Sequence, residues 1–360
     1  MRHHLLIIGL LALFVFSCNQ PEVALEKQIE TIKVSLKGNQ FLTDELFSTN
    51  FDRVDSLLFV SLDDQKAAFH IYNINDDFSF VKAFAYKGEG PGEFRTAAIS
   101  DIEQVNDDYH VSIFDRAKYR LTVYSLKDIL NEEKSLPIYS FRMHPKHGLS
   151  AALVKTGNTT YVGTPGLDVM NRGRLHFYDT LTQESTKNEL IPKDQRFDQL
   201  SDYPKYNLYF SRIAKHPTKE LIASVMRGFD RLDIYDFEGN LVHEVKSPNY
   251  EREYELSLIG DKATEKKFYM GVRGSEKYIY AIYYDQLDKD YSRDLIPTQI
   301  KIFSWEGQEL ANIEVPEYLM SFEVDEERGR LYGVAYFEEK TMTYDISNIL
   351  NQLNQTYESN

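Results

Sequence analysis

Residues 86–126 read YKGEGPGEFRTAAISDIEQVNDDYHVSIFDRAKYRLTVYSL, and this stretch decides the fold of the 360-residue chain. A glycine-rich connector comes first, followed by three runs in which apolar and polar residues alternate. A period of two, carried by β-branched and aromatic residues, is typical of β-strands. The last two runs, DYHVSIF and YRLTVYSL, therefore predict a β-hairpin, and the first run predicts a neighbouring strand.

The last run belongs to a motif that occurs six times. The six copies are AAFHIYNI (67–74), YRLTVYSL (119–126), GRLHFYDT (173–180), DRLDIYDF (230–237), TQIKIFSW (298–305) and KTMTYDIS (340–347). Their aromatic anchors are separated by 52, 54, 57, 68 and 41 positions, and a second strand-like run precedes each copy. Further strand candidates flank most pairs. Six units of about four strands with a period near 50 predict an all-β, six-bladed β-propeller.

A propeller ring must close, because an open ring leaves a sheet edge unpaired. The run ETIKVSL (30–36) precedes the first unit, and we expect it to complete the last blade near Tyr344. The competing folds are a β-sandwich array and two separate β domains, which would need a Pro-, Gly- or Ser-rich linker near the middle of the chain. No such linker is present. Helix is expected only at 125–133 and 345–355.

The connector GEGPGEF could suggest a phosphate-binding loop. Its glycines, Gly88, Gly90 and Gly92, alternate, whereas nucleotide loops use G-x-G-x-x-G or G-x-x-x-x-G-K-[ST] and lead into a helix. Here the following residues alternate like a strand. We therefore expect the glycines to supply special backbone angles, with Pro91 stiffening a loop that crosses from blade one to blade two.

Residues 86–126 resemble an NHL-type repeat unit, with a glycine connector, a phenylalanine, an inner strand and a second strand that ends in Asp115. The connector also resembles that of the TolB-like, six-bladed propeller lipoproteins of Bacteroidetes-type bacteria. The looser blade pattern covers about 45–348. The resemblance implies a single propeller domain, which we place at 30–348, followed by a C-terminal tail at 349–360.

The chain begins MRHHLLIIGLLALFVFSC, with one basic residue and an apolar run from Leu5 to Phe16. This is the layout of an export signal, and the run is too short to span a membrane well. Residues 15–18 resemble a bacterial lipobox, and Cys18 is the only cysteine of the chain. We therefore expect a signal peptide at 1–17, a lipidated Cys18 and a tether at 18–29. The alternative is a signal peptide whose cysteine is incidental.

The net negative charge of the chain argues against two kinds of main partner, nucleic acid and anionic lipid surfaces. The formal net charge is −15, and cleavage of the leader, which contains Arg2 and no acidic residue, would make it −16. Nucleic acid and anionic lipid surfaces demand a basic footprint, so neither is expected as the main partner. The membrane contact is therefore expected through the Cys18 lipid, at the outer membrane, on its periplasmic or its exterior side.

Motifs of enzymes and metal sites are weak. The chain contains no G-x-S-x-G string, and no second cysteine is available for a thiol enzyme. His144 and His147 stand in a loop, and the acidic insertion at 283–295 lacks the spacing of a calcium loop. No metal, cofactor or catalytic residue is therefore predicted.

Five presumed inner strands remain as the source of a binding site: AISDIEQ, SAALVKT, YFSRIAKH, FYMGVRG and MSFEVDEE. Acidic residues are few in them, whereas Tyr209, Arg212, Tyr269 and Arg273 recur in comparable positions. We predict that these four residues edge the channel and bind ligand, because arginine and tyrosine attract anionic or planar groups. The predicted function is a non-catalytic binding module for a protein, peptide or glycan. The alternative is a metal-assisted hydrolase or lyase of the gluconolactonase kind.

Overall fold

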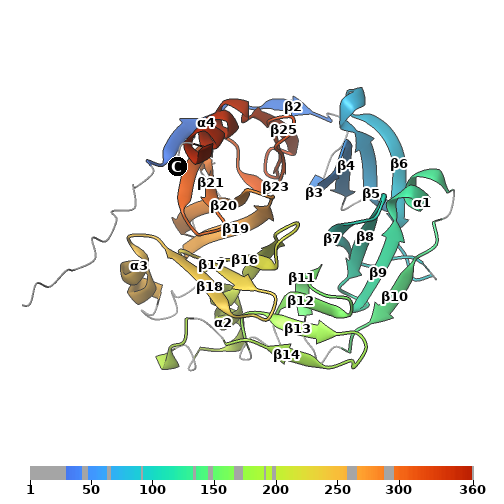
Figure 1. Cartoon of the computed structure of the whole chain (residues 1–360), viewed down its shortest axis with the longest axis horizontal. Coiled ribbons are helices and arrows are strands. Elements are labelled where there is room, and N and C mark those ends of the chain that lie inside the picture. The colour runs from blue at the N-terminus through green and yellow to red at the C-terminus, as the bar shows by residue number, and fades with distance from the viewer. Residues whose placement is uncertain are drawn as a thin grey trace, which may run out of the picture. The chain divides into compact units, whose positions relative to one another are not determined.

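The computed structural model describes residues 30–42, 48–62, 66–90, 92–132, 135–144, 149–165, 173–189, 192–196, 200–257, 266–287 and 296–358. Residues Thr31–Asn360 form one compact unit, and Met1–Glu30 form the other. All the elements described below belong to the first of these units. Within it, six β-sheets are arranged around a central channel (Figure 1).

Each sheet contains an antiparallel meander of consecutive strands that runs outward from an inner strand, and each forms one blade. Blade 1 contains β3 (Ser48–Val54), β4 (Leu57–Leu62), β5 (Ala67–Asn73) and β6 (Ser79–Tyr86). Blade 2 contains β7 (Ala97–Val105), β8 (Asp108–Asp115), β9 (Arg120–Ser125) and β10 (Tyr139–Arg142). Blade 3 contains β11 (Leu149–Lys155), β12 (Thr160–Pro165), β13 (His176–Asp179) and β14 (Ser185–Lys187). Blade 4 contains β15 (Ser211–Lys215), β16 (Leu221–Met226), β17 (Arg231–Asp236) and β18 (Leu241–Lys246). Blade 5 contains β19 (Lys266–Gly274), β20 (Tyr278–Leu287), β21 (Thr298–Ser304) and β22 (Glu309–Val315). Blade 6 contains β23 (Leu319–Asp325), β24 (Arg330–Ala335) and β25 (Lys340–Asp345).

The predicted all-β, six-bladed propeller is confirmed. The six copies of the sequence motif are the third strands β5, β9, β13, β17, β21 and β25, and the runs before them are the second strands. Their aromatic anchors are buried, for example Tyr124, Tyr235 and Phe303, because both faces of these central strands pack against neighbouring blades. This two-sided burial accounts for the strength of the motif.

The N-terminal segment closes the ring, but by a different strand from the one expected. The predicted strand ETIKVSL contains β1 (Ile32–Ser35), which pairs in parallel with β22 and adds a fifth strand to blade 5. The next strand, β2 (Asn39–Phe41), pairs with β25 and completes blade 6. Gly38 between them passes so close to the Tyr344 ring that a Cβ would lie 2.5 Å from it. The N-terminal segment therefore covers two outer edges rather than one.

In the described part of the chain, four α-helices and a short 3-10 helix, η1 (Ile74–Asp76), join or follow the strands. The expected helices are present as α1 (Leu126–Asn131), capped by the Ser125 hydroxyl, and α4 (Ser347–Glu358). Part of the predicted C-terminal tail thus forms α4, which buries apolar side chains against blades 5 and 6. Two further helices, α2 (Asp202–Tyr209) and α3 (Tyr250–Ser257), were not predicted. They lie in the connections before β15 and β19.

The glycine connector joins the outer strand β6 of blade 1 to the inner strand β7 of blade 2. The Gly88 N–H donates to the main-chain oxygen of Phe94 at 2.9 Å, and the Gly90 N–H donates to Oε2 of Glu93 at 2.7 Å. Gly92 has φ +81°, and nothing lies within 4 Å of a Cβ added there. Gly92 is therefore required by its backbone angle and not by lack of space.

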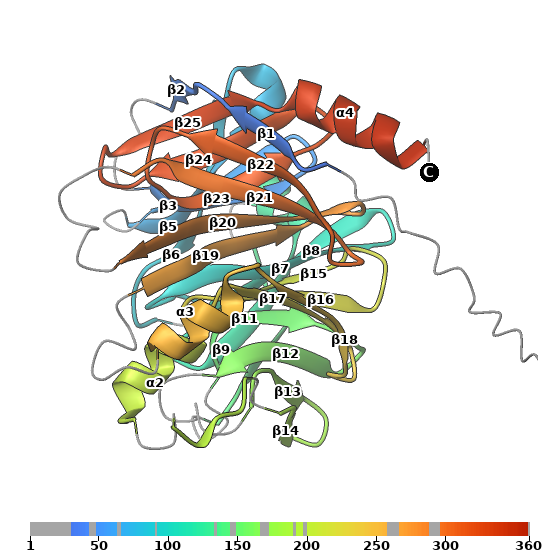
Figure 2. The same cartoon turned by 90° about the vertical axis from the view of Figure 1, so that its left-hand side faces the viewer.

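The ring has two different faces. Because each blade is a four-stranded meander, every outer strand ends where the next inner strand begins. We call this side, which carries the connections with α2 and α3, the crossover face. The opposite side, with the turns between first and second strands, is the hairpin face. Figure 2 shows α2 and α3 on the same side of the ring.

Candidate functional site

A cavity of about 670 Å³ lies in the channel near the hairpin face. The inner strand of every blade contributes to its wall, through Asp52, Ile99, Val154, Ala214, Val272 and Glu323 in blade order. Residues of the first hairpin turns, such as Asn106 and Thr218, also line it. The cavity therefore depends on the closed ring, and no single blade could form it.

Arg273 on β19 is the centre of one charged network in the cavity. Its Nε lies 3.0 Å from Oε2 of Glu323, and its Nη2 lies 3.5 Å from Oδ1 of Asp52. Nη2 also donates to the main-chain oxygen of Phe51 at 2.7 Å and to Oδ1 of Asn50 at 3.1 Å. One guanidinium thus joins blade 5 to blades 6 and 1, on either side of the ring closure.

Asp52 in this network has its pKa raised to about 7. The main cause is burial, which disfavours the charged carboxylate. The charge of Arg273 lowers the pKa, the nearby charge of Glu323 raises it, and a hydrogen bond of 2.9 Å from Nδ2 of Asn50 lowers it. The Asp52 carboxyl therefore changes its charge near neutral pH, in the wall of the cavity.

A second charged network lies on the wall formed by blades 2, 3 and 4. Nζ of Lys215 is 2.7 Å from Oδ2 of Asp101, and the main-chain N–H of Lys155 donates to the same oxygen at 3.0 Å. Nζ of Lys155 is 2.9 Å from Oε2 of Glu103. Each cation of this network is therefore matched by a carboxylate. The expectation of an inner wall poor in acidic residues does not hold at this end of the channel.

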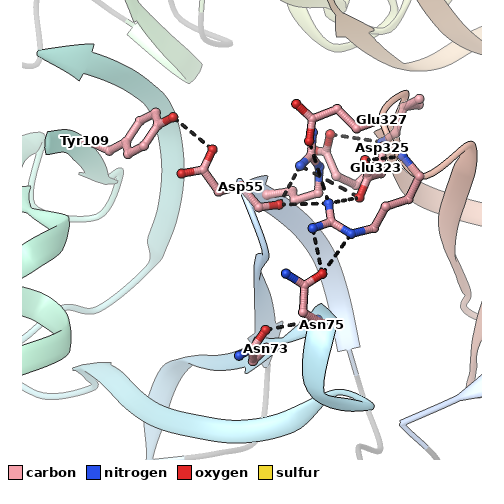
Figure 3. Close-up of polar contacts among 10 residues, drawn as sticks. Asp55, Asn73, Asn75, Tyr109, Glu323, Asp325 and Glu327 are labelled. Atoms are coloured by element: carbon pink, nitrogen blue, oxygen red, sulfur yellow. Dashed lines mark hydrogen bonds and ion pairs between the residues drawn. The ribbon is translucent and has the colours of Figure 1, made fainter. Parts of the chain in front are cut away.

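The rim at the hairpin face is held by polar contacts between blades (Figure 3). Nη2 of Arg328, in the first turn of blade 6, donates to Oδ1 of Asn75 in blade 1 at 2.7 Å, and its Nη1 donates to Oδ2 of Asp325 at 2.8 Å. The hydroxyl of Tyr109 in blade 2 donates to Oδ1 of Asp55 in blade 1 at 3.0 Å. These contacts fix the mouth of the cavity across three blades.

Two of the four predicted ligand-binding residues reach the channel. Arg273 lines the cavity. Arg212, on β15, lies nearer the crossover face, where its guanidinium is exposed and stands 4.9 Å from the centre of the Phe210 ring. The positive charge of Arg273 acts on Arg212, so the two groups belong to one electrostatic environment. Arg212 and Arg273 lie on the inner strands of the neighbouring blades 4 and 5.

The two predicted tyrosines are buried. Tyr209 ends helix α2 rather than lying on the inner strand, and its hydroxyl donates to the main-chain oxygen of Pro192 at 2.5 Å. Tyr269 lies on β19 and packs edge-on against Tyr283 at 5.0 Å, and burial raises its pKa well above the usual value. Both side chains lie in apolar clusters between blade 4 and its neighbours.

Other residues singled out in the sequence lie outside the described residues. These are Cys18, Pro91, His147 and the acidic segment 288–295. Within the described part of the chain, no group of three or more His, Cys, Asp or Glu side chains could hold a metal ion. The described helices include none with the length and apolar character needed to cross a membrane.

Asp52 was not predicted as a site residue, because the sequence pattern did not reveal the inner strand of blade 1. The segment STNFDRV forms β3, whose buried residues, Ser48, Phe51 and Val54, do not alternate, and a register shift interrupts its pairing with β4 between Ser48 and Asn50. The signal that could have found it is its place before the first hairpin, where every later blade has an inner strand. Asp101 and Glu103 were visible as alternate residues of one inner strand.

Three comparisons place the chain among known proteins. A family model described as TolB-like 6-blade propeller-like matches residues 50–327. A member of the DUF4221 family from Bacteroides vulgatus is similar in structure, with a TM-score of 0.52, 12% identity, and coverage of 88% of this chain and 94% of that one. Raptor from Chaetomium thermophilum gives a TM-score of 0.50 and 10% identity, over 89% of this chain and 30% of that one. The curated proteins include no match to the sequence.

Proposed function

The chain belongs to the TolB-like six-bladed propeller family, and we propose that it is a non-catalytic binding module of the bacterial cell envelope. In this proposal a lipid on Cys18 holds the propeller at the outer membrane. The channel receives part of a protein, peptide or glycan. Propellers host many functions, so the proposal rests on the site and not on the fold.

The observation that carries the proposal is the cavity of about 670 Å³, with walls from all six blades. Its size is in the range of ligand pockets in proteins. Its carboxylates and cations already pair with each other at 2.7 to 3.5 Å, as for Lys215–Asp101 and Arg273–Asp52. Such groups are held in place before a ligand arrives, which lowers the entropy that binding costs. The same groups supply donors and acceptors for a hydroxyl-rich or amide-rich ligand.

The test blocks the cavity without removing its charges. Ala214 lines the cavity from β15, and Ala214→Trp would fill part of it. Ala83→Trp, on the outer strand β6, is the matched control, because Ala83 is half-buried and far from the channel. Residues 30–360 of each protein are screened against a glycan array and a random-peptide library, and folding is checked by thermal melting.

We expect the native protein and the control to bind the same library members. Ala214→Trp should weaken this binding about tenfold or more, since the Trp side chain would occupy the space next to the charged wall groups that the ligand needs. Unchanged binding by the Ala214→Trp protein would reject the cavity as the binding site. Release of a cleaved product from a bound member would reject the non-catalytic part of the proposal.

A further inference from the structure

The connections before β15 and β19 lie on the crossover face, away from the cavity. Helices α2 and α3 both lie there, as does the glycine connector before β7 (Figure 2). In repeat proteins the connections that differ between repeats often form the binding face.

Three arginines lie at this end of the inner hairpins. Arg212 is the second residue of inner strand β15, and Arg227 directly follows β16, whose last residue pairs with the first residue of β15. The main-chain N–H of Arg227 donates to the main-chain oxygen of Phe210 at 2.8 Å. Arg116 directly follows Asp115, which pairs with the first residue of inner strand β7. We call Arg116, Arg212 and Arg227 the arginine mouth.

The arginine mouth has no carboxylate partners in the described part of the chain. No ion pair joins any of its three guanidinium groups to a described Asp or Glu, in contrast to Arg273 and Lys215 deeper in the channel. Arg212 rests instead on the Phe210 ring, at 4.9 Å. The Arg212 and Arg116 side chains are both exposed, so the charges face solvent and are accessible to a ligand.

These charges are close enough to influence one another. Although Arg212 is exposed, the surrounding protein desolvates it, and this lowers its pKa. The charges of Arg273, Arg116 and Arg227 lower the pKa of Arg212 further, while Tyr206 raises it. A chain with a net charge of −15 thus concentrates like positive charge at one channel opening. Mutual repulsion of this kind is relieved when an anion binds among the cations.

We propose that the arginine mouth binds a ligand through a multiply charged oxyanion group, such as a diphosphate or a polycarboxylate. A single carboxylate would neutralise only one of three guanidinium groups, so the arrangement favours an anion with two or more charges close together. The planar guanidinium presents paired donors that match oxyanion geometry. The Phe210 ring packs against one side of the Arg212 guanidinium. The three arginines of the arginine mouth are not among the residues that line the cavity, although the charge of Arg273 in the cavity wall also acts on Arg212.

The test measures binding of pyrophosphate, citrate and acetate by calorimetry at low salt. Arg212→Gln and Arg116→Gln remove one cation each from the arginine mouth. Arg330→Gln is the control, because Arg330 is also a partly exposed arginine but pairs with Asp345, at 3.2 Å, on the hairpin face. Thermal melting establishes that each variant folds.

We expect pyrophosphate or citrate to bind more tightly than acetate, and the stronger of the two identifies phosphate or carboxylate as the preferred group. Arg212→Gln and Arg116→Gln should each weaken binding about tenfold, the loss expected for a charge-assisted hydrogen-bonding partner, while Arg330→Gln should leave it unchanged. Equal binding of all three anions would overturn the proposal. Equal losses in all three variants would overturn it too, since the effect would then follow net charge alone.

Discussion

Arg174, which precedes β13 of blade 3, reaches into blade 4 and forms a fully buried ion pair with Asp233 of β17, with 3.2 Å between Nη2 and Oδ2. The same guanidinium donates to the hydroxyls of Ser211 at 2.7 Å and Ser224 at 3.0 Å. It therefore contacts three successive strands of the neighbouring blade. Asp233 also accepts a hydrogen bond from Nε of Arg231 at 2.7 Å. Asp233 thus pairs with two buried cations, of which Arg231 has a second carboxylate partner, Glu244, at 2.5 Å.

Replacement of Asp233 by Asn should lower the free energy of unfolding by about 3–5 kcal/mol, because it leaves the buried guanidinium of Arg174 without its carboxylate partner. Urea unfolding at pH 7 measures the effect. The matched change is Arg330→Gln, which breaks the exposed pair with Asp345 and should cost less than about 1 kcal/mol. Similar losses in the two variants would show that the buried pair has no special role between the blades.

Asp52 should make the stability of the propeller depend on pH. The pKa of its carboxyl is about 7 in the folded protein, above the ordinary value of 3.8. Between these values the folded state keeps a proton that the unfolded chain has released, so stability falls as the pH rises through this window. Above pH 7 the Asp52 carboxyl is ionised in both states, so it no longer changes the free energy of unfolding as the pH rises.

The replacement Asp52→Asn removes this titration. Each pH unit within the window is worth about 1.4 kcal/mol, so between pH 5 and pH 8 the variant should gain about 3 kcal/mol relative to the native protein. The measurement is the difference between the two unfolding free energies at each pH. Curves that stay parallel from pH 5 to pH 8 would contradict the raised pKa.

The N-terminal strands should be needed for a stable, monomeric ring. Deletion of residues 1–42 removes β1 and β2 and exposes the edges of β22 and β25, so we expect a lower melting temperature and self-association.

Phe41→Ala alone should lower the free energy of unfolding by about 3–5 kcal/mol, because the Phe41 ring packs against Phe51 at 5.8 Å and Tyr332 at 5.5 Å.

Deletion of residues 1–29 is the control for ring closure, since it leaves both strands in place. Melting and size-exclusion chromatography compare the two truncated proteins. If the shorter chain melts and elutes like the control, the closing strands contribute little.

Cys18 should carry the membrane anchor. The native protein should partition with membranes and incorporate a palmitate analogue, whereas Cys18→Ser should stay unprocessed or be released. The physical reason is that the leader contains the longest apolar run of the chain, and a mature body of charge −16 is not attracted to anionic lipid. Membrane retention of the Cys18→Ser protein after cleavage of its leader would refute the lipid anchor.

The glycine connector shows how far local sequence reasoning reaches. Its alternating glycines and the strand that follows predicted a crossing loop, and the loop does join β6 to β7. The requirement for Gly92 comes from its φ of +81°, a local property. The position of Glu93, whose carboxylate accepts from the Gly90 N–H, belongs to the same loop. The backbone angle of Gly92 and the contact of Glu93 with the Gly90 N–H depend on residues close together in the chain, so they can be predicted from the local sequence.

The sequence by itself determined the class of fold, the number of blades and the identity of the second and third strands, because period-two alternation follows from strand geometry, in which successive side chains point to opposite faces of a sheet. Tertiary structure alone decided which outer edges β1 and β2 cover, since several edges offer the same main-chain groups to an incoming strand. It also decided that Tyr209 and Tyr269 are buried while Arg212 faces solvent. The pairing of Arg273 with Asp52 joins residues more than two hundred positions apart, and only the closed ring brings their charges together.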